Sequence, residues 1–347
     1  MNLYKIAGVI NIMLKDTLRD KIKAYLKMNR VHEYLQLDHP FEVEFLAQGE
    51  YNINFTVNDE RKMYVFRVNT GSQLALENQI KYEYDALKTL EMSGVTPKVY
   101  YVDDTKEYLD YGILIMEFLH GRPLEYDKDL EKAAKIFAKI HSIDLTNMDT
   151  TNFIVETDIF SDRILEARRL LNDFLNDQRV DKELKKFFTG FLEWAEKNKD
   201  REKYFIENKW HVINNTEVNS HNFIIGAKHS YLIDWEKPVI SDPCQDLTQF
   251  LASTTTLWKA NYLLTKTEKE MFFKTYINMM NGDNNIRERV ELYMPYLYLR
   301  ALSWCAYAWL EYQKPDKDIK NMDTFNKISE YLNVDFMKHL LKEYIIV

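Results

Sequence analysis

The spacing of the apolar residues changes twice along the chain, and this constrains the fold more than any other feature. Residues from about Asp16 to Leu37 have helical spacing. From Phe41 the apolar residues alternate as they do in strands, and after Pro123 the spacing is helical almost throughout. The expected helical stripe near the N-terminus consists of Leu18, Ile22, Tyr25 and Leu26. The pattern predicts an α+β fold with a small antiparallel sheet lobe before a larger, mainly helical lobe.

The first third of the chain should form a five-stranded sheet with one helix. The helix is expected over Gln73–Met92, where Ile80, Glu83 and Leu87 recur at helical spacing, and Gly94 should end it. The strands are expected at Val43–Ala47, Tyr51–Val57, Met63–Val68, Lys98–Asp103 and Gly112–Phe118.

Helices should dominate the rest of the chain, apart from one hairpin. They are expected near residues 128–143, 159–178, 182–198, 243–252, 267–280, 287–313 and 323–344. The predicted division is a helical extension at 1–40, a sheet lobe at 41–119 and a helical lobe at 120–347.

Composition excludes several classes of protein. The 46 Lys and Arg residues are outnumbered by 54 Asp and Glu, and a net charge of −8 argues against non-specific nucleic-acid binding. No run approaches the roughly 20 apolar residues that a membrane span needs. The apolar N-terminal run is short for a signal core, and the two cysteines lack metal-ligand spacing. We therefore expect a cytoplasmic protein with reduced thiols.

The main candidate functional residues lie at the ends of the predicted hairpin and on the loop before it. Asn222 precedes its first strand and Asp234 follows its second, so both side chains should lie at one end. An amide oxygen and a carboxylate are hard ligands that suit Mg²⁺. A third group, Glu217, stands on the preceding loop and could orient a hydroxyl. These are the groups that phosphoryl transfer from ATP requires. The two strands are expected at Phe223–Ile225 and Tyr231–Ile233.

Two backbone segments could contact the nucleotide. Gly49 lies in a turn between two strands, where a residue without Cβ lets backbone N–H groups approach phosphates. A single glycine in a hairpin more often marks an ordinary turn without a ligand. The backbone from Glu117 to Leu119 follows an apolar run and could meet the adenine edge as a hinge. An interior strand that enters a loop fits that sequence equally well.

Glu83 lies on the apolar stripe of the predicted helix, where an unpaired carboxylate would be costly to desolvate. Arg67, at the end of the preceding strand, is the natural partner. A bidentate pair would direct the guanidinium toward the ATP phosphates. A half-exposed glutamate at the margin of the stripe explains the helix pattern equally well.

Taken in order, these blocks resemble the aminoglycoside phosphotransferase and choline kinase-like family, which comprises small-molecule kinases with a protein-kinase-like fold. The resemblance covers roughly residues 40 to 312. The ordered series is quite specific, although no single block is decisive. The blocks are QGEYNINF, YVFRVN, KYEYDALKTLE, GVTPKVY, ILIMEFLHGRPL, AKIFAKIH, the segment with Glu217 and Asn222, YLIDWE and SDPCQDL.

The resemblance assigns roles by position. Arg67 becomes the phosphate-binding cation in place of the commoner lysine, and Asn222 and Asp234 become the Mg²⁺ ligands. Glu217 falls where the family pattern HGDxxxxN has its catalytic Asp, because His-Gly-Asp reads Asn-Thr-Glu here. The extra methylene moves the carboxylate by roughly 1.5 Å, and a misplacement of about 1 Å can cost about 100-fold in rate. Asp246 is expected to secure this loop by hydrogen bonding.

The resemblance implies an ATP- and Mg²⁺-dependent phosphotransferase that acts on a hydroxyl of a small polar metabolite, either cationic or polyhydroxylated. The alternative is a catalytically impaired, nucleotide- or ligand-binding pseudokinase of the same fold, with Glu217 marking the lost chemistry. Phosphorylation of a protein is less favoured, because the chain has no obvious activation segment between Asp234 and Asp242. The acceptor pocket is expected within about 150–210 and 255–345.

Overall fold

The structure, a computed structural model, describes residues 3–28, 31–37, 40–49, 51–72, 76–146, 148–282, 284–314 and 322–345. The chain groups by packing into two compact units. We call the first the sheet unit; it comprises Met1–Pro123, Ile143–Phe153 and Asn222–Pro238. The second, the helical unit, comprises Leu124–Ser142, Ile154–His221 and Val239–Val347. The hairpin therefore packs with the N-terminal sheet, while the division at 1–40, 41–119 and 120–347 stays a prediction about domain boundaries.

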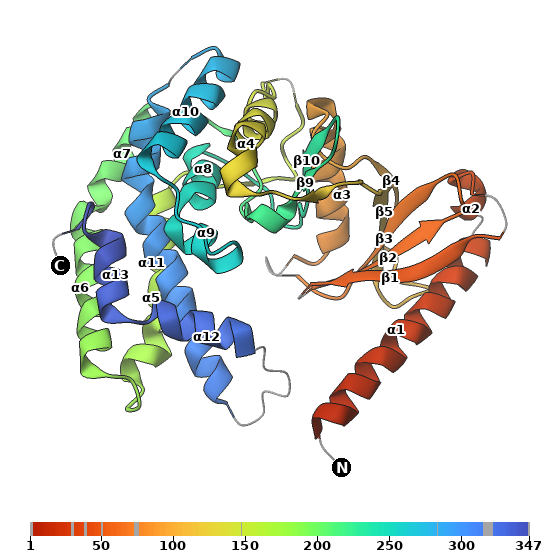
Figure 1. The fold of residues 1–347 in the computed structure, drawn as a ribbon, viewed down its shortest axis with the longest axis horizontal. Helices are drawn as coiled ribbons and strands as arrows, with labels where there is room; N and C mark the ends of the chain where they lie inside the picture. The colour runs from red at the N-terminus through yellow and green to blue at the C-terminus, as the bar shows by residue number, and fades with distance from the viewer. Residues whose placement is uncertain are drawn as a thin grey trace. The chain divides into compact units, whose positions relative to one another are not determined.

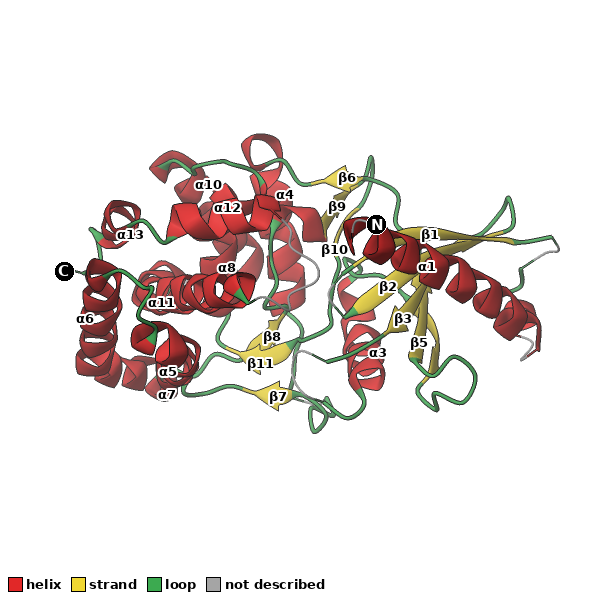
Figure 2. Ribbon diagram, turned by 90° about the horizontal axis from the view of Figure 1, so that it is seen from below, coloured by secondary structure: helices red, strands yellow, loops and turns green. Residues whose placement is uncertain are grey.

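The sheet unit is built on a five-stranded antiparallel sheet, as the sequence predicted (Figures 1 and 2). The strand order, which the sequence did not predict, is β1-β2-β3-β5-β4. The ends of each observed strand lie within one residue of the predicted ends. The strands are β1 (Glu42–Gln48), β2 (Asn52–Asn58), β3 (Met63–Asn69), β4 (Val99–Asp103) and β5 (Gly112–Glu117).

The helix predicted over Gln73–Met92 starts later than expected, and Gln73 itself lies outside the described residues. Helix α3 spans Gln79–Leu90, and a short 3-10 turn, η1 (Glu91–Ser93), leads to Gly94 at φ 68°. The Asn78 side chain accepts a hydrogen bond from the N–H of Lys81 and so caps the helix. The N–H of Leu76 instead bonds to a serine hydroxyl. Side chains that compete for backbone groups therefore delay the start of the helix.

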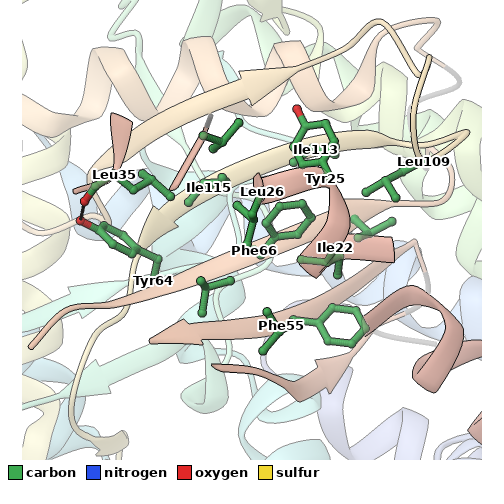
Figure 3. Packing of buried hydrophobic residues seen from close by; sticks show 14 of the residues in the cluster. Ile22, Tyr25, Leu26, Leu35, Phe55, Tyr64, Phe66, Leu109, Ile113 and Ile115 are labelled. Carbon is green, nitrogen blue, oxygen red and sulfur yellow. Dashed lines mark hydrogen bonds between the residues drawn. The ribbon is translucent and has the colours of Figure 1, made fainter. Parts of the chain in front are cut away.

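The N-terminal stripe is buried as predicted and lies on a single helix, but the one helix predicted from about Asp16 to Leu37 is observed as two. These are α1 (Leu3–Met28) and α2 (Val31–Tyr34), and residues 29–30 between them lie outside the described residues. Leu18, Ile22 and Leu26 are at most 2% exposed and join the core of the sheet (Figure 3). Labelled members of that cluster are Ile22, Tyr25, Leu26, Leu35, Phe55, Tyr64, Phe66, Leu109, Ile113 and Ile115.

The helical unit follows the predicted helix positions closely. The long helices are α4 (Tyr126–His141), α5 (Ile159–Asn176), α6 (Lys182–Asn198), α10 (Lys266–Met280) and α11 (Ile286–Gln313). The shorter ones are α7 (Lys203–Glu207), α8 (Cys244–Leu251), α9 (Ser253–Lys259), α12 (Met322–Tyr331) and α13 (Val334–Leu341). Of these, α7 and α9 were not predicted. The helix predicted over 323–344 is divided, because the Asn333 side chain accepts from the Phe336 N–H and starts α13.

The expectation that the hairpin would be the one strand structure after Pro123 was wrong. A small three-stranded sheet in the helical unit joins β7 (Ile154–Val155), β11 (Val239–Ser241) and β8 (Val212–Asn214). These strands are only two or three residues long, so they show too little alternation to be recognised in the sequence. No helix within the described ranges is both long enough and apolar enough to cross a membrane.

Candidate functional site

The predicted hairpin is present in the sheet unit. Strand β9 (Phe223–Ile225) pairs with β10 (Ser230–Leu232), and a short third strand, β6 (Arg122–Pro123), pairs with β9. Beyond the last pair, the N–H of Ile233 donates to the carbonyl of Asn222 at 2.8 Å. Asn222 and Asp234 therefore lie at the same end of the hairpin. Gly226 is needed in the turn, because a Cβ there would lie 2.6 Å from the His229 carbonyl oxygen.

Asp234 has a left-handed backbone, at φ 65°. Its side chain is about one-third exposed, and its Oδ1 lies 3.6 Å from Nη2 of Arg67. A carboxylate oxygen of Glu236 lies within 4.8 Å of one of Asp234. The segment after the hairpin thus presents two carboxylates side by side, with one guanidinium beside them.

Arg67 forms the expected ion pair with Glu83, which is 1% exposed. The expected bidentate geometry is wrong, because the guanidinium is shared among partners. Its Nη1 donates to Glu83, its Nε donates to Oδ1 of Asn54 at 3.0 Å, and its Nη2 faces Asp234. Arginine makes these three contacts at once because its donors form a rigid fork.

The electrostatics of this cluster favour a bound cation. Burial raises the pKa of Glu83 to about 7, an effect that Arg67 opposes and Asp234 reinforces. Burial lowers the pKa of Arg67, but Glu83, Asp234 and Glu236 together raise it above its ordinary value. When all three carboxylates are ionised, one guanidinium cannot balance them. Hard oxygen ligands with excess negative charge are a set that fits Mg²⁺.

The loop that carries Glu217 belongs to the helical unit and is held by Asp246, as expected. The buried Asp246 carboxylate accepts from the N–H of Asn215 at 2.7 Å and from the N–H of Thr216 at 2.8 Å. Its own N–H donates to the Asn214 side chain. Two charge-assisted hydrogen bonds therefore fix the backbone just before Glu217.

Thr216 adopts φ 67°, a left-handed conformation that is unusual for a β-branched residue. The related sequence pattern has glycine at this position, and glycine takes that conformation without strain. Glu217 itself is half-buried, and its N–H donates to Oδ1 of Asn215 at 3.0 Å. Thr216 thus takes a conformation that the glycine of the pattern would adopt without strain, while the side chains of the loop differ from the pattern.

The remaining predicted residues lie in the sheet unit. Gly49 closes the β1–β2 turn, where its N–H donates to the Asn52 carbonyl at 2.8 Å, and the neighbouring Glu50 lies outside the described residues. A Cβ at Gly49 would meet only an ordinary contact at 3.8 Å, so the turn itself does not require glycine. Glu117 ends β5, and its side chain accepts from the Lys98 N–H at 3.2 Å. Leu119 is half-buried in the following loop.

Sequence reasoning missed several residues that hold the segment after Asp234. Asn52 donates to Glu236, Gln79 donates to the Glu236 carbonyl, and Tyr82 donates to the carbonyl of Pro238. One signal was available, because Asn52 and Asn54 stand two apart on a strand and therefore face the same side. Polar side chains that become buried on such a strand need a hydrogen-bond partner.

Comparison with known proteins gives a consistent result. Residues 42–275 match the model of the phosphotransferase enzyme family, which is more than half of the chain. No curated protein sequence matches the chain significantly.

Several solved structures have the same fold at low sequence identity. Choline kinase of Cryptosporidium parvum Iowa II is 15% identical, with 87% of this chain and 90% of that chain covered and a TM-score of 0.61. Ethanolamine kinase of Plasmodium vivax is also 15% identical, with 93% and 90% covered and a TM-score of 0.62. Spectinomycin phosphotransferase in complex with ADP and spectinomycin is 15% identical, with 90% and 96% covered and a TM-score of 0.57. The chain has a protein-kinase-like fold and belongs to the phosphotransferase enzyme family.

Proposed function

We propose that this protein transfers the γ-phosphate of ATP, in a Mg²⁺-dependent reaction, to a hydroxyl of a small polar metabolite. Family membership supports phosphoryl transfer. The observation that carries the proposal is the shared guanidinium of Arg67, which contacts both the buried Glu83 and the hairpin residue Asp234. A cation held between a helix and the end of this hairpin is suited to a triphosphate and its metal ion.

Each group in the sheet unit has a proposed role. Asn222 and Asp234 hold Mg²⁺ through oxygen atoms, and Arg67 orients the phosphates while Glu83 fixes its side chain. The turn at Gly49 contacts the phosphates, although the N–H of Gly49 itself is bonded to the Asn52 carbonyl. The backbone from Glu117 to Leu119 contacts the adenine. When bound, Mg²⁺ neutralises charge on the β- and γ-phosphate oxygens.

Glu217 is proposed to orient the acceptor hydroxyl and to receive its proton. Its loop differs from the family pattern at three adjacent positions, so the longer side chain of Glu217 did not change alone. In phosphoryl transfer this carboxylate mainly positions the attacking oxygen, while metal ions and cations stabilise most of the charge. A glutamate can therefore serve where an aspartate is usual.

The proposed acceptor is small, polar and either cationic or polyhydroxylated. The names of the structural neighbours include choline, ethanolamine and spectinomycin, which have hydroxyl groups and basic or cationic nitrogen. The acidic net charge of the chain is compatible with a cationic acceptor.

The test incubates the purified protein with Mg²⁺, ATP and a panel of hydroxylated amines and sugars, and detects phosphorylated products by mass spectrometry. Asp234→Asn should abolish transfer while the protein stays folded, since asparagine also tolerates a left-handed backbone. Glu217→Gln should reduce the rate at least tenfold with little change in nucleotide affinity. Asp144→Asn, on an exposed turn, is the matched control and should behave as the unmodified protein. Full activity of Asp234→Asn would refute the metal assignment.

A pseudokinase that binds a nucleotide or another ligand is the second candidate. The observation that favours it is the Asn-Thr-Glu sequence at residues 215–217 in place of His-Gly-Asp. Thermal stabilisation by Mg²⁺-ATP without phosphate transfer to any member of the panel would support this candidate and contradict the first.

A further inference from the structure

Side chains from the N-terminal part of the sheet unit hold the segment that follows Asp234. Asn52 on β2 donates to Oε2 of Glu236 at 2.5 Å. From α3, Gln79 donates to the Glu236 carbonyl, and its own Oε1 accepts from a serine hydroxyl at 2.6 Å. Tyr82, one turn further along α3, donates to the Pro238 carbonyl. Both the backbone and the side chain of Glu236 are therefore fixed.

The Asn52 amide can satisfy its contacts in only one orientation. Its Oδ1 accepts from Nδ2 of Asn69 at 2.9 Å, so its own NH₂ group must face Glu236. Asn69 is in turn fixed by donating to the Gly71 carbonyl at 2.8 Å. Asn52 is 5% exposed, so water competes little for either contact. The chain Asn69–Asn52–Glu236 thus specifies the position of one carboxylate.

The position of that carboxylate matters because two groups attract it. Glu236 lies beside Asp234, with carboxylate oxygens within 4.8 Å of each other, where a metal ion would draw both. Arg67 also attracts Glu236 electrostatically. The hydrogen bond from Asn52 holds Glu236 independently of both, and so reduces the rearrangement that metal binding requires.

We propose that Asn52 is a positioning residue that holds the Glu236 carboxylate beside Asp234 for Mg²⁺ binding. This inference rests on the proposed function. It assigns a role to β2, the strand that follows the Gly49 turn. Through the Asn52 amide, β2 sets the geometry of the metal-binding segment. Asn52 itself contacts neither the metal nor the nucleotide in this role.

The test titrates Mg²⁺ into the protein with a saturating fluorescent, non-hydrolysable ATP analogue, and a parallel thermal melt is recorded without metal. Asn52→Ala should weaken the apparent Mg²⁺ affinity about tenfold, which corresponds to one charge-assisted hydrogen bond. Asn58→Ala, the same change at the other end of β2, is the matched control and should leave the affinity unchanged. In a Glu236→Ala background, Asn52→Ala should not change the Mg²⁺ affinity further, because the carboxylate that Asn52 positions is absent.

The outcomes separate this inference from the proposed function. If Asp234→Asn weakens Mg²⁺ binding but Asn52→Ala only lowers the melting temperature of the metal-free protein, the positioning role is refuted and the proposed function stands. If the unmodified protein shows no Mg²⁺-dependent nucleotide binding, the proposed function itself fails. Should Asn52→Ala not fold, Asn69→Ala replaces it, because it removes the donor that fixes the orientation of the Asn52 amide. An unchanged Mg²⁺ affinity in Asn69→Ala would overturn the proposal.

Discussion

Replacing Asp246 with asparagine tests how the loop before Glu217 is held. The Asp246 carboxylate is fully buried and accepts two backbone N–H groups, from Asn215 at 2.7 Å and Thr216 at 2.8 Å. Asparagine has nearly the same shape, but it offers one acceptor oxygen and places an NH₂ group against the other N–H. One hydrogen bond is lost, and two donors face each other in a buried site.

The expected destabilisation follows from these contacts. A hydrogen bond to a charged group contributes about 1.5–3 kcal/mol, and an unsatisfied buried donor costs about 1–3 kcal/mol. The free energy of unfolding should therefore fall by roughly 3 kcal/mol, a large fraction of the 5–15 kcal/mol typical of a folded protein. Phosphate transfer should fall as well, because the loop that positions Glu217 loses its anchor.

The assay is urea denaturation of Asp246→Asn, with unfolding monitored by circular dichroism. Asp144→Asn is the matched control, since that carboxylate also accepts a backbone N–H, from Thr146 at 2.9 Å, but on an exposed turn. Asp144→Asn should change the unfolding midpoint very little. If Asp246→Asn destabilises the protein no more than Asp144→Asn does, the account of the loop is wrong.

Three further predictions concern Arg67, Thr216 and Glu83. Arg67→Lys should cost roughly 1–3 kcal/mol and weaken Mg²⁺-ATP binding, because one ammonium cannot serve Glu83 and Asp234 together; unchanged denaturation and nucleotide titrations would contradict this. Thr216→Gly should leave stability unchanged or raise it by up to ~1 kcal/mol, since it relieves the left-handed strain, and a clear loss in the melting temperature would refute the reasoning. Burial raises the pKa of Glu83 from 4.5 to about 7, so the folded protein keeps a proton that the unfolded chain releases between these pH values. Stability should therefore fall by up to about 3 kcal/mol as the pH rises through that window, and denaturation of Glu83→Gln across the same pH range should lack this slope.

Local patterns predicted the parts of the fold that depend on near neighbours. The buried stripe of α1, the strands of the sheet and the hairpin between Asn222 and Asp234 each follow from spacing and turn residues within about ten positions. The start of α3 was missed because Ser72 and Asn78 compete for backbone groups, an effect that helical spacing does not reveal.

Contacts between distant residues could not be predicted in the same way. The sequence indicated that Glu83 needs a cation, and Arg67 was the correct partner. The sharing of Arg67 with Asp234 depends on tertiary packing, and so does the hydrogen bond from Asn52 to Glu236, which joins residues 184 positions apart. A single sequence identifies the chemical groups of such a site, but not which groups hold them in place.

The most direct test of the central claim is a crystal structure of the protein with Mg²⁺ and a non-hydrolysable ATP analogue. We predict a metal ion about 2.0–2.1 Å from oxygen atoms of both Asn222 and Asp234, with the triphosphate beside Arg67. A nucleotide bound elsewhere, or a metal ion that neither residue coordinates, would contradict the account.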